Sequence, residues 1–340
     1  MTEAGHRSPR RSAGKTQVAR AVWYVGKERV EIRPAPLPPL AAGHARVRTL
    51  FSGISRGTER LVFTGAVGES EWQRMRAPLQ EGAFPFPVKY GYCATGVVEE
   101  GPPALLGRAV FCLHPHQDVF DAPVAMLAPL PDDLPPRRAT LAANMETALN
   151  AVWDAGAAPG DRILVVGAGI VGLLVAALAA RIPGADVTVT DIDTGRAGLV
   201  ESLGARFLHP LPGDFDADIV VHASASAAGL ETAIAAAGME AVIIELSWYG
   251  DRAVPVRLGG AFHSRRLRLQ SSQVGQLPPA RRPRWDYRRR LEAALNLLRV
   301  PALDALVADE IAFADAASAL PRVLAADSRG LPPVIRYQTP

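Results

Sequence analysis

The sequence predicts an α/β protein in which a small domain of short strands precedes a doubly wound parallel sheet. Three observations carry this prediction. Strand-like and helix-like segments alternate from residue 163 to residue 270, an apolar strand runs into a glycine-rich turn at 163–172, and residues 18–113 hold only short strands between glycine and proline turns. The 340 residues are enough for two domains, and 49% hydrophobic residues are enough for a sizeable core.

The first part of the chain reads as short strands. Apolar and polar residues alternate, or apolar residues gather between turns, and we expect strands at 18–25, 30–32, 44–51, 94–99 and 108–113. Turns are expected at Gly26-Lys27 and over 53–57, and the proline-rich stretch 34–39 is expected to be a connector. Many short strands joined in this way are typical of a small β-barrel-like domain.

The pattern changes after Pro135-Pro136, where residues 138–154 have helical spacing. Strands are then expected at 163–166, 186–190, 218–221, 241–245 and 267–270, and helices at 170–182, 196–203, 227–237 and 287–298. This alternation indicates β-α-β units on a parallel sheet with right-handed crossovers. The last 40 residues are expected to be a mixed return segment.

Composition excludes several classes of partner and fold. A net charge of +3 with 21% charged residues is too mild for a nucleic-acid-binding surface. No apolar run reaches the roughly 18 to 20 residues that span a bilayer. The two cysteines, Cys93 and Cys112, exclude a disulfide framework and favour a cytoplasmic protein. Residues 1–16 are polar and basic, which predicts a disordered tail.

Six arginines lie between residues 281 and 290. They are Arg281, Arg282, Arg284, Arg288, Arg289 and Arg290. A charge run of this kind favours a solvated helix face or the rim of a homodimer interface. The alternative is contact with an acidic or phosphate-bearing substrate.

A glycine pattern opens the expected dinucleotide site. The apolar strand 163–166 is followed by Gly167, Gly169 and Gly172 in the order G-x-G-x-x-G, and a helix follows. The first glycine permits the tight turn, the second lets the backbone approach a pyrophosphate, and the third lets the helix pack on the strand. The helix N-terminus then offers free N–H groups to the phosphates, which makes Ala168, Ile170 and Val171 cofactor contacts as well.

A carboxylate at the end of the next strand indicates which nicotinamide cofactor binds. Asp191 lies directly after the strand 187–190, at the place where a carboxylate accepts hydrogen bonds from both ribose hydroxyls and repels a 2′-phosphate. This favours NAD. Arg196 keeps NADP possible because an arginine there can receive the 2′-phosphate, and Ile192 is included among the cofactor contacts.

Three stretches resemble the medium-chain dehydrogenase/reductase family, which includes the zinc alcohol dehydrogenases. They are Ser52-Gly53-Ile54-Ser55-Arg56-Gly57-Thr58-Glu59, then Pro87 to Val98 (PVKYGYCATGVV), and the glycine-rich strand with Arg196 and Leu203-Gly204-Ala205 after it. The resemblance covers residues 18 to 340. It implies a GroES-like β-barrel domain followed by a Rossmann domain, with a C-terminal return to the first domain. We divide the chain accordingly into a tail (1–16), a catalytic domain (17–150), a cofactor domain (151–299) and the return (300–340).

The chain departs from the family where zinc would bind. Ser55 stands in place of a ligand cysteine, Tyr92 in place of a ligand histidine, and Ala143 or Asn144 in place of the third ligand. The structural-zinc lobe is also missing. We therefore expect no zinc, and a branch of the family that lacks it. A displaced site built from Cys93, Cys112, His114 or His116 stays open as an alternative.

Without zinc, a hydrogen-bond donor must stabilise the charge on the substrate oxygen during hydride transfer. Tyr92 is the first candidate, provided that its pKa is lowered, and Glu59 is a relay or partner. Ser55 and Thr58 could pass a proton, and Lys89 could lower the pKa of Tyr92 or bind an anionic group. Each has a plain structural alternative: Tyr92 as a plug in the empty metal cavity, Glu59 in an ion pair with Arg56 or Arg60, Ser55 and Thr58 as turn caps, and Lys89 in solvent.

The other candidate contacts follow the strands of the cofactor domain or lie on the helix that leads into it. They are Asn144 for the substrate, and Thr147, Ser224, Ser247, Trp248 and Ser271 for the cofactor. The sequence thus predicts a zinc-independent NAD(P)-dependent oxidoreductase that acts on an alcohol or ketone, works as a homodimer and has only a small molecule as its other partner. Two alternatives stay open: an NADPH-dependent reductase of an activated C=C bond, and a non-catalytic dinucleotide-binding protein.

Overall fold

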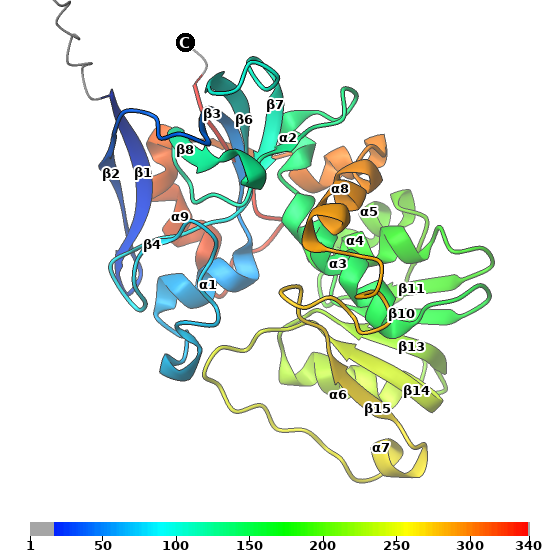
Figure 1. The fold of residues 1–340 in the computed structure, drawn as a ribbon. Coiled ribbons are helices and arrows are strands. Elements are labelled where there is room, and N and C mark those ends of the chain that lie inside the picture. Colours follow the sequence, from blue (N-terminus) through cyan, green and yellow to red (C-terminus); the bar gives the residue numbers. More distant parts are fainter. Residues whose placement is uncertain (1–16, 339–340) are drawn as a thin grey trace, which may run out of the picture.

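The computed structural model describes residues 17–338. Residues 1–16, where the disordered tail is expected, and residues 339–340 lie outside the described part. Figure 1 shows the N-terminal strands, in blue to cyan, on one side of the molecule and a parallel sheet, in green to yellow, on the other. The last elements of the chain, in red, return to the side of the N-terminal strands.

Two sheets make up the N-terminal side. Their strands are β1 (Gln17–Gly26), β2 (Arg29–Leu37), β3 (His44–Gly53), β4 (Glu81–Gly82), β5 (Val88–Lys89), β6 (Ala94–Glu100), β7 (Ala109–Cys112), β8 (Val119–Pro123), β9 (Ala128–Pro129), β16 (Glu310–Ala312) and β17 (Val334–Arg336). The smaller sheet has the order β2-β1-β5-β4 and the larger the order β16-β17-β3-β6-β7-β9, with β8 also paired to β3. β17 pairs antiparallel with β3, so the end of the chain is part of the first domain's sheet.

Two local expectations are wrong here. β2 continues through Pro34 and Pro36 to Leu37, where a connector was expected. This strand lies at the edge of its sheet, and an edge strand tolerates proline because no partner needs the missing N–H. The expected turn at 53–57 runs into helix α1 (Arg56–Thr64), which ends at Gly65 in the left-handed conformation with φ of 68°.

The second sheet is parallel throughout. Its strands are β10 (Arg162–Val166), β11 (Asp186–Thr190), β12 (Arg206–Phe207), β13 (Ala217–His222), β14 (Ala237–Glu245) and β15 (Arg268–Ser271). Their spatial order is β12-β11-β10-β13-β14-β15. The chain moves outward from β10 in one direction and then returns to the other side of it, so the topological switch point lies between β10 and β13. The predicted doubly wound sheet is confirmed.

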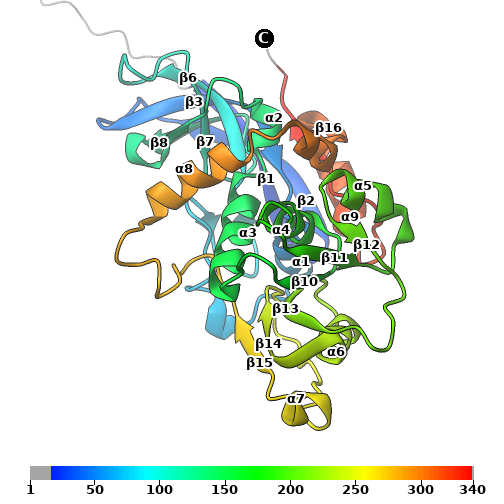
Figure 2. The ribbon, with the colours of Figure 1, turned by 90° about the vertical axis from the view of Figure 1, so that its right-hand side faces the viewer.

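Both faces of this sheet are covered by helices. Ile163 and Val165 of β10 belong to the core shared with α3 (Ala142–Ala155), α4 (Ile170–Ala179) and α8 (Tyr287–Leu297). Leu164 and Val166 point to the other face and pack with α6 (Ala227–Ala236). Alternate residues of a strand face opposite sides, which is why the whole strand is apolar. Figure 2 shows α3, α4 and α8 gathered on one side of the strands.

The remaining helices connect these layers. They are α2 (Pro136–Ala139), α5 (Ala197–Ser202), α7 (Ala261–Ser264) and α9 (Ala316–Leu324), besides short turns of 3₁₀-helix. The single helix expected over 138–154 is divided into α2 and α3 at Thr140-Leu141. α3 carries the chain from the first domain to β10. Within residues 17–338, no helix has both the length and the apolar character to cross a bilayer.

Candidate dinucleotide and active site

The glycine turn after β10 has the geometry that its sequence predicts. Gly167 has φ of +109°, which an L side chain rarely adopts, and a Cβ atom there would come within 2.9 Å of the Ser224 amide nitrogen. A Cβ atom on Gly172 would lie 1.9 Å from the Gly167 carbonyl oxygen, so the start of α4 packs directly on the turn. Around Gly169 no protein atom lies within 4 Å of such a Cβ, so this side of the turn is open to a ligand.

Asp191 braces this turn. Its Oδ2 accepts a hydrogen bond from the Ala168 amide at 2.6 Å, and its Oδ1 accepts one from the Asp193 amide at 2.8 Å. The carboxylate is thereby fixed beside the glycine turn, at the end of β11. Ile192 next to it is 90% exposed, an unusual position for a large apolar side chain and one suited to the flat face of an adenine. Arg196 pairs with Asp193 at 3.2 Å.

Arg56, from the first domain, lies near Arg196, and the sequence did not predict Arg56 as a cofactor residue. Arg56 opens α1, and its Nη1 donates to the Gly330 carbonyl at 2.7 Å. Its Nε is buried without a hydrogen-bond partner among the described residues. Burial, and then the charges of Arg60 and Arg196, lower the pKa of Arg56 to about 10. Arg196 is already paired with Asp193, whereas Arg56 forms no ion pair within the described residues, so Arg56 is the arginine of the two that is suited to hold an anion.

The catalytic candidates meet in a cluster of hydroxyl groups at the N-terminus of α1. Tyr92 donates to Ser55 Oγ at 2.6 Å, and Thr58 lies close enough to the phenol to influence its pKa. The condition set for this role, a lowered pKa of Tyr92, is not met. Burial, and then the neighbouring Cys93, raise the pKa of Tyr92 well above its ordinary value. Tyr92 therefore stays a neutral donor, and Ser55 keeps its own hydrogen to donate onward.

Glu59 lies beneath this cluster, and its partner is neither Arg56 nor Arg60. Its Oε1 accepts from the Ser55 amide at 2.7 Å, and its Oε2 accepts from the Tyr24 hydroxyl at 2.7 Å. His116 Nε2 lies 3.0 Å from the same Oε2. Glu59 and His116 are 1% and 0% exposed, so this is a fully buried pair, and it reaches Tyr92 only through Ser55.

His116 bonds on its other side as well. Its Nδ1 lies 2.7 Å from Ser52 Oγ, which in turn lies 3.0 Å from the Tyr337 hydroxyl on the C-terminal return. Nothing in the local sequence predicts this role, because His116 and Glu59 are separated by 57 positions. The neighbouring His114 differs. Its ring stacks on Phe120, and burial lowers its pKa to about 3, so it stays neutral.

The expected roles of Lys89 at the active site are wrong. Its ammonium group is buried and bonds Glu81 and the Gln117 side chain, the latter at 2.7 Å. It lines a separate surface cavity of about 370 Å³ between the first hairpin and β8, together with Trp23 and Phe120. Lys89 is not among the groups that shift the pKa of Tyr92. The alternative of a solvated lysine is wrong too, because only 2% of the side chain is exposed.

Asn144 and Thr147 share one face of α3. They are the partly exposed residues of the stretch 141–151, as their spacing of three predicts for one face of a helix. Asn144 Oδ1 lies 4.0 Å from Cys93 Sγ, so it stands next to the Tyr92–Cys93 segment. The Thr147 hydroxyl donates to the Ala143 carbonyl at 3.1 Å and keeps its lone pairs for another partner.

The arginine run at 281–290 is structured, which corrects the expectation of a solvated face for at least one member. Arg290 is 3% exposed, and its guanidinium bonds Glu146 at 3.0 Å and the Asn150 side chain at 2.9 Å. Arg289 lies 4.1 Å over the Trp285 ring. The Arg290 contacts fasten α8 to α3, whereas the other arginines of the run are exposed, as expected of a solvated face.

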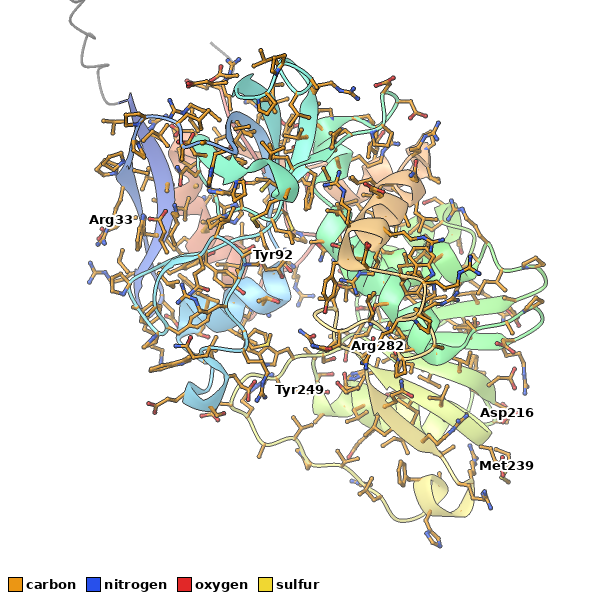
Figure 3. The ribbon with its side chains drawn as sticks, viewed as in Figure 1. Arg33, Tyr92, Asp216, Met239, Tyr249 and Arg282 are labelled. Carbon is orange, nitrogen blue, oxygen red and sulfur yellow. The ribbon has the colours of Figure 1, made fainter. Side chains whose placement is uncertain are left out.

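The remaining cofactor candidates follow the strand ends. Ser224 is exposed and touches the glycine turn, Ser247 accepts from the Ala225 amide at 3.0 Å, and Ser271 ends β15. Trp248 packs against the core of the first domain, and the Asp251 amide donates to the Ala66 carbonyl at 3.2 Å, so this segment joins the two domains. Figure 3 shows Tyr249 of this segment and Tyr92 in the middle of the molecule.

The residues present do not fit a catalytic zinc. Two of the positions at which the resemblance places zinc ligands hold Ser55 and Tyr92, whose hydroxyl groups bond each other. The third position offers a methyl group or an amide. Zinc in proteins prefers thiolate, imidazole and carboxylate ligands. Across residues 17–338, no three histidine, cysteine or acidic side chains are grouped closely enough to hold a metal ion. Burial also raises the pKa of both Cys93 and Cys112, which keeps them as thiols.

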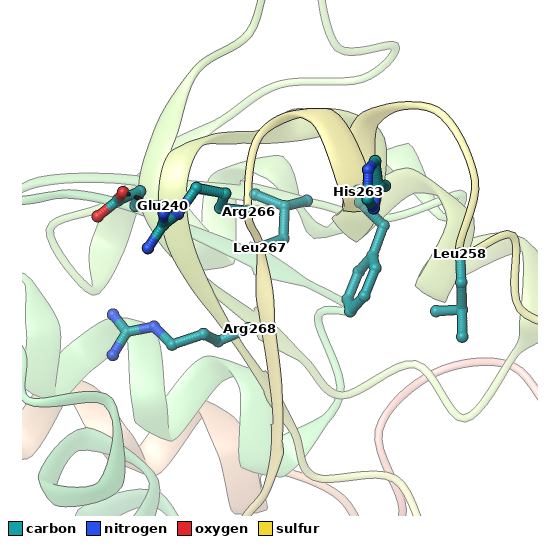
Figure 4. A pocket seen from close by; sticks show the side chains of 7 residues that line it. Glu240, Leu258, His263, Arg266, Leu267 and Arg268 are labelled. Carbon is teal, nitrogen blue, oxygen red and sulfur yellow. Dashed lines mark ion pairs between the residues drawn. The ribbon is translucent and has the colours of Figure 1, made fainter.

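A second surface cavity, of about 790 Å³, lies away from these residues. It is open to solvent near α7 and is lined by Leu258, Phe262 and the Arg266–Arg268 segment, which Figure 4 shows with Glu240 facing Arg266. These residues stand at the amino ends of β14 and β15. Ligands of open parallel sheets bind at the carboxyl ends, so this cavity is not the dinucleotide site.

Comparison with known sequences supports the reading of the cofactor half. The family model of the alanine dehydrogenase/PNT C-terminal domain matches residues 142–253. L-galactonate-5-dehydrogenase from Escherichia coli K12 is 38% identical over 110 residues, which are 31% of this chain and 32% of that protein. The match therefore spans about a third of the length of this relative.

Solved structures match nearly the whole chain. L-idonate 5-dehydrogenase from Escherichia coli has a TM-score of 0.75 at 14% identity, with 95% of this chain and 99% of that chain covered. A zinc-binding dehydrogenase from Sinorhizobium meliloti, solved with NADP, has a TM-score of 0.73 at 17% identity, with 94% and 99% covered. The chain has the two-domain fold of the medium-chain dehydrogenases/reductases. The fold class inferred from the sequence is confirmed, and membership of the family and of its zinc-lacking branch stays a prediction.

Proposed function

We propose that this chain is a zinc-independent oxidoreductase that transfers a hydride between a nicotinamide cofactor and an alcohol or ketone. The observation that carries the proposal is the glycine turn at the switch point. Gly169 is open to a ligand, while Gly167 and Gly172 leave no room for a side chain. Such a turn fits a pyrophosphate, and α4 supplies free amide groups behind it.

The bound nicotinamide supplies or accepts the hydride, and the chain orients the partners and handles the oxygen. Asp191, held by two backbone amides, receives the ribose hydroxyls. Thr147 and Asn144 are partly exposed on one face of α3, the helix that leads from the first domain to the parallel sheet. Asn144 lies beside the Tyr92–Cys93 segment and serves as a hydrogen-bond partner for the substrate.

Hydroxyl groups take the place of a Lewis acid. Because Tyr92 donates to Ser55 Oγ, the remaining hydrogen of Ser55 is available for a substrate oxygen. A donor polarised by a second donor stabilises developing negative charge better than a single hydroxyl does. In the reverse direction the alcohol hydroxyl donates a hydrogen bond to Ser55 Oγ, and its proton leaves to solvent as the hydride passes to the oxidised cofactor, because Tyr92 and Ser55 are both neutral hydroxyl groups.

The preference between NAD and NADP depends on a carboxylate and two arginines near the expected ribose site. Asp191 favours NAD, because a carboxylate beside the ribose repels a 2′-phosphate. Arg56 and Arg196, which lie close enough to shift a pKa, favour a phosphate in their vicinity. We assign Arg56 to the pyrophosphate and NAD to the site, with NADP as the weaker ligand.

The second candidate function is reduction of an activated C=C bond with NADPH. The pair Arg56 and Arg196 is the observation that favours it, because it could receive the 2′-phosphate. A third candidate, non-catalytic dinucleotide binding, agrees with the absent metal ligands. Each gives a different result in the test of function.

The test titrates the purified protein with NADH and NADPH and measures turnover on panels of secondary alcohols, polyols, ketones and enones. The proposal predicts tighter binding of NADH and turnover of an alcohol or ketone. Turnover of enones alone, with NADPH preferred, would favour the second candidate. Binding without any turnover would favour the third, and no binding of either nucleotide would contradict all three.

We further propose that the protein is a homodimer, acts in the cytoplasm and has no nucleic-acid or membrane partner. Support for the homodimer is β15, an exposed strand at the edge of the parallel sheet with free backbone groups. Support for a reducing compartment is that Cys93 and Cys112 are both buried free thiols. Light scattering of the purified protein tests the dimer.

A further inference from the structure

A buried polar cluster lies at the carboxyl ends of the two strands beyond the switch point. His222 is the last residue of β13 and Glu245 the last residue of β14, and the two are paired in register. The Ala223 amide donates to the Val166 carbonyl, and the next residue, Ser224, touches the glycine turn. The crevice of the switch point is therefore bounded by Gly167 on one side and Ser224 on the other.

His222 is 0% exposed, and its Nε2 side meets the crevice through Ser224, while its Nδ1 also lies 3.5 Å from Ser247 Oγ and 3.4 Å from the Tyr249 hydroxyl. Its Nδ1 lies 2.8 Å from Glu245 Oε2, and its Nε2 lies 2.7 Å from Ser224 Oγ. Ser224 itself is exposed. A Cβ atom on Gly229 would lie 2.1 Å from Ser224 Oγ and 2.8 Å from His222 Nε2, so the first turn of α6 closes over the pair.

The partners define a direction of donation. Glu245 Oε1 already accepts from the Ser247 amide at 2.7 Å, and a carboxylate can only accept, so His222 Nδ1 donates to Oε2. In the neutral ring Nε2 is then the acceptor, and Ser224 must donate to it. Ser226 Oγ accepts a hydrogen bond from the Gly229 amide at 3.0 Å, so the hydrogen of the Ser226 hydroxyl is free to donate elsewhere. Ser224 Oγ lies 3.0 Å away and can accept it.

We propose that His222 and Glu245 are a positioning pair that fixes the Ser224 hydroxyl as a hydrogen-bond acceptor toward the dinucleotide. The Ser224 hydrogen is committed to His222 and one lone pair is committed to Ser226, so the other lone pair faces the crevice. The cofactor group that binds to this lone pair must be a hydrogen-bond donor, which is either a ribose hydroxyl or the carboxamide N–H. This inference rests on the proposed function, because it assumes that a dinucleotide occupies the crevice.

The test measures the Kd of NADH by the change in its fluorescence, with NADH as the probe. Ser224→Ala removes the acceptor and should raise Kd by about 3- to 10-fold, the value of one net hydrogen bond. Glu245→Gln keeps the shape of the side chain but reverses the direction of hydrogen-bond donation between this residue, His222 and Ser224. The Gln oxygen stays with the Ser247 amide, its NH₂ group donates to His222 Nδ1, and the ring then donates to Ser224. Ser224 becomes a donor toward the crevice, and Kd should rise by a similar factor.

Two further results separate positioning from general stabilisation. The double variant E245Q/S224A should bind NADH no more weakly than Ser224→Ala alone, because Glu245 acts through Ser224. Nitrogen-15 spectra of the histidine side chains should show His222 with its hydrogen on Nδ1 in the wild type and on Nε2 in Glu245→Gln. His222→Gln identifies the signal. Thr232→Ala, which removes a hydroxyl on α6 outside the chain of bonds, is the matched control and should leave Kd unchanged.

Three results would overturn the inference: an Nε2–H or doubly protonated His222 in the wild type, NADH affinity in Ser224→Ala equal to that of the wild type, or multiplying losses in the double variant. Thermal melting without cofactor shows whether a variant is folded. If the wild-type protein binds no NADH, the proposed function fails first. If the wild type binds NADH and the variants bind it equally well, only the role of His222, Glu245 and Ser224 fails.

Discussion

Glu59 and His116 form a fully buried pair, with Oε2 and Nε2 3.0 Å apart, under the hydroxyl groups of the candidate active site. Both side chains are almost completely withdrawn from solvent. A carboxylate in such a place needs partners for both oxygens, and it has them in Ser55, Tyr24 and His116. The pair therefore fixes the N-terminus of α1, which sets the positions of Ser55 and Thr58.

Removing one partner of the buried Glu59–His116 pair should lower the free energy of unfolding more than removing an exposed charge does. His116→Ala leaves the Glu59 carboxylate buried with fewer partners and should lower the free energy of unfolding by about 3 kcal/mol. Arg206→Ala, which breaks the exposed pair with Asp186, is the control and should change it little. Urea denaturation of the two variants measures the difference. Equal effects would contradict the importance of the buried pair.

The same pair predicts how stability depends on pH. Burial raises the pKa of Glu59, but His116, Tyr24 and the Ser55 amide outweigh burial and hold it below its ordinary value of 4.5. A carboxyl group with a lowered folded-state pKa contributes stability above its unfolded pKa and loses it as pH falls through the folded value. The stability difference between wild type and Glu59→Gln should therefore shrink as pH falls below about 4.5. A difference that grows on acidification would contradict this.

Gly169→Val should abolish cofactor binding without harming the fold. The new side chain meets no protein atom within 4 Å at its Cβ, yet it fills the space through which the pyrophosphate approaches the backbone. NADH affinity should fall by at least about 100-fold, while the melting temperature of the unliganded protein stays near that of the wild type. Gly198→Ala, at an equally open glycine on α5, is the control. Wild-type affinity in Gly169→Val would contradict the position of the cofactor.

Asp191 should decide between the two cofactors. Asp191→Ser removes the charge beside the ribose while keeping a short polar group for the Ala168 amide. The ratio of kcat/KM for NADPH to that for NADH should rise by about tenfold or more, because the repulsion of a 2′-phosphate is lost. Arg196→Ala should move the ratio in the opposite direction. If neither variant changes the ratio, the ribose does not lie at Asp191.

Tyr92→Phe should depress the hydride step and leave NADH affinity unchanged, because Ser55 then loses the donor that polarises it. Tyr90→Phe, at the neighbouring ring 6.0 Å away, is the matched control. Because burial raises the pKa of Tyr92, its deprotonation should cause no loss of kcat between pH 8 and pH 10. Unaltered single-turnover rates in Tyr92→Phe would refute the role of this tyrosine.

Sequence patterns predicted the parallel sheet well because the relevant signals are local. An apolar run, a glycine turn and an amphipathic or apolar helix follow one another within 163–179, and the structure places β10, the turn and α4 there. The strand predicted over 30–32 was expected to end before the prolines of 34–39, because an isolated segment does not reveal that its strand will lie at a sheet edge. α1 was missed because its Ser-Arg-Gly-Thr start reads as a turn.

The site was less predictable because its contacts join distant segments. His116 meets Glu59 across 57 positions, and Arg290 meets Glu146 across 144 positions. Lys89 lies in the same motif as Tyr92 and precedes it. Alternate residues of an extended segment point in opposite directions, and only the fold shows which way each side chain points. Chemical type alone suggested the hydroxyl cluster, and the packing of α1 decided which groups meet.

The most direct test of hydride transfer without zinc is a single turnover of chelator-treated protein, with its zinc content measured on the same sample. The protein is mixed with NADH and a ketone that it turns over, and the absorbance of NADH is followed. We predict oxidation of NADH at the rate of the untreated protein with well under one zinc ion per chain, and no increase when zinc is added. Loss of the reaction on chelation, and its return with zinc, would contradict the account.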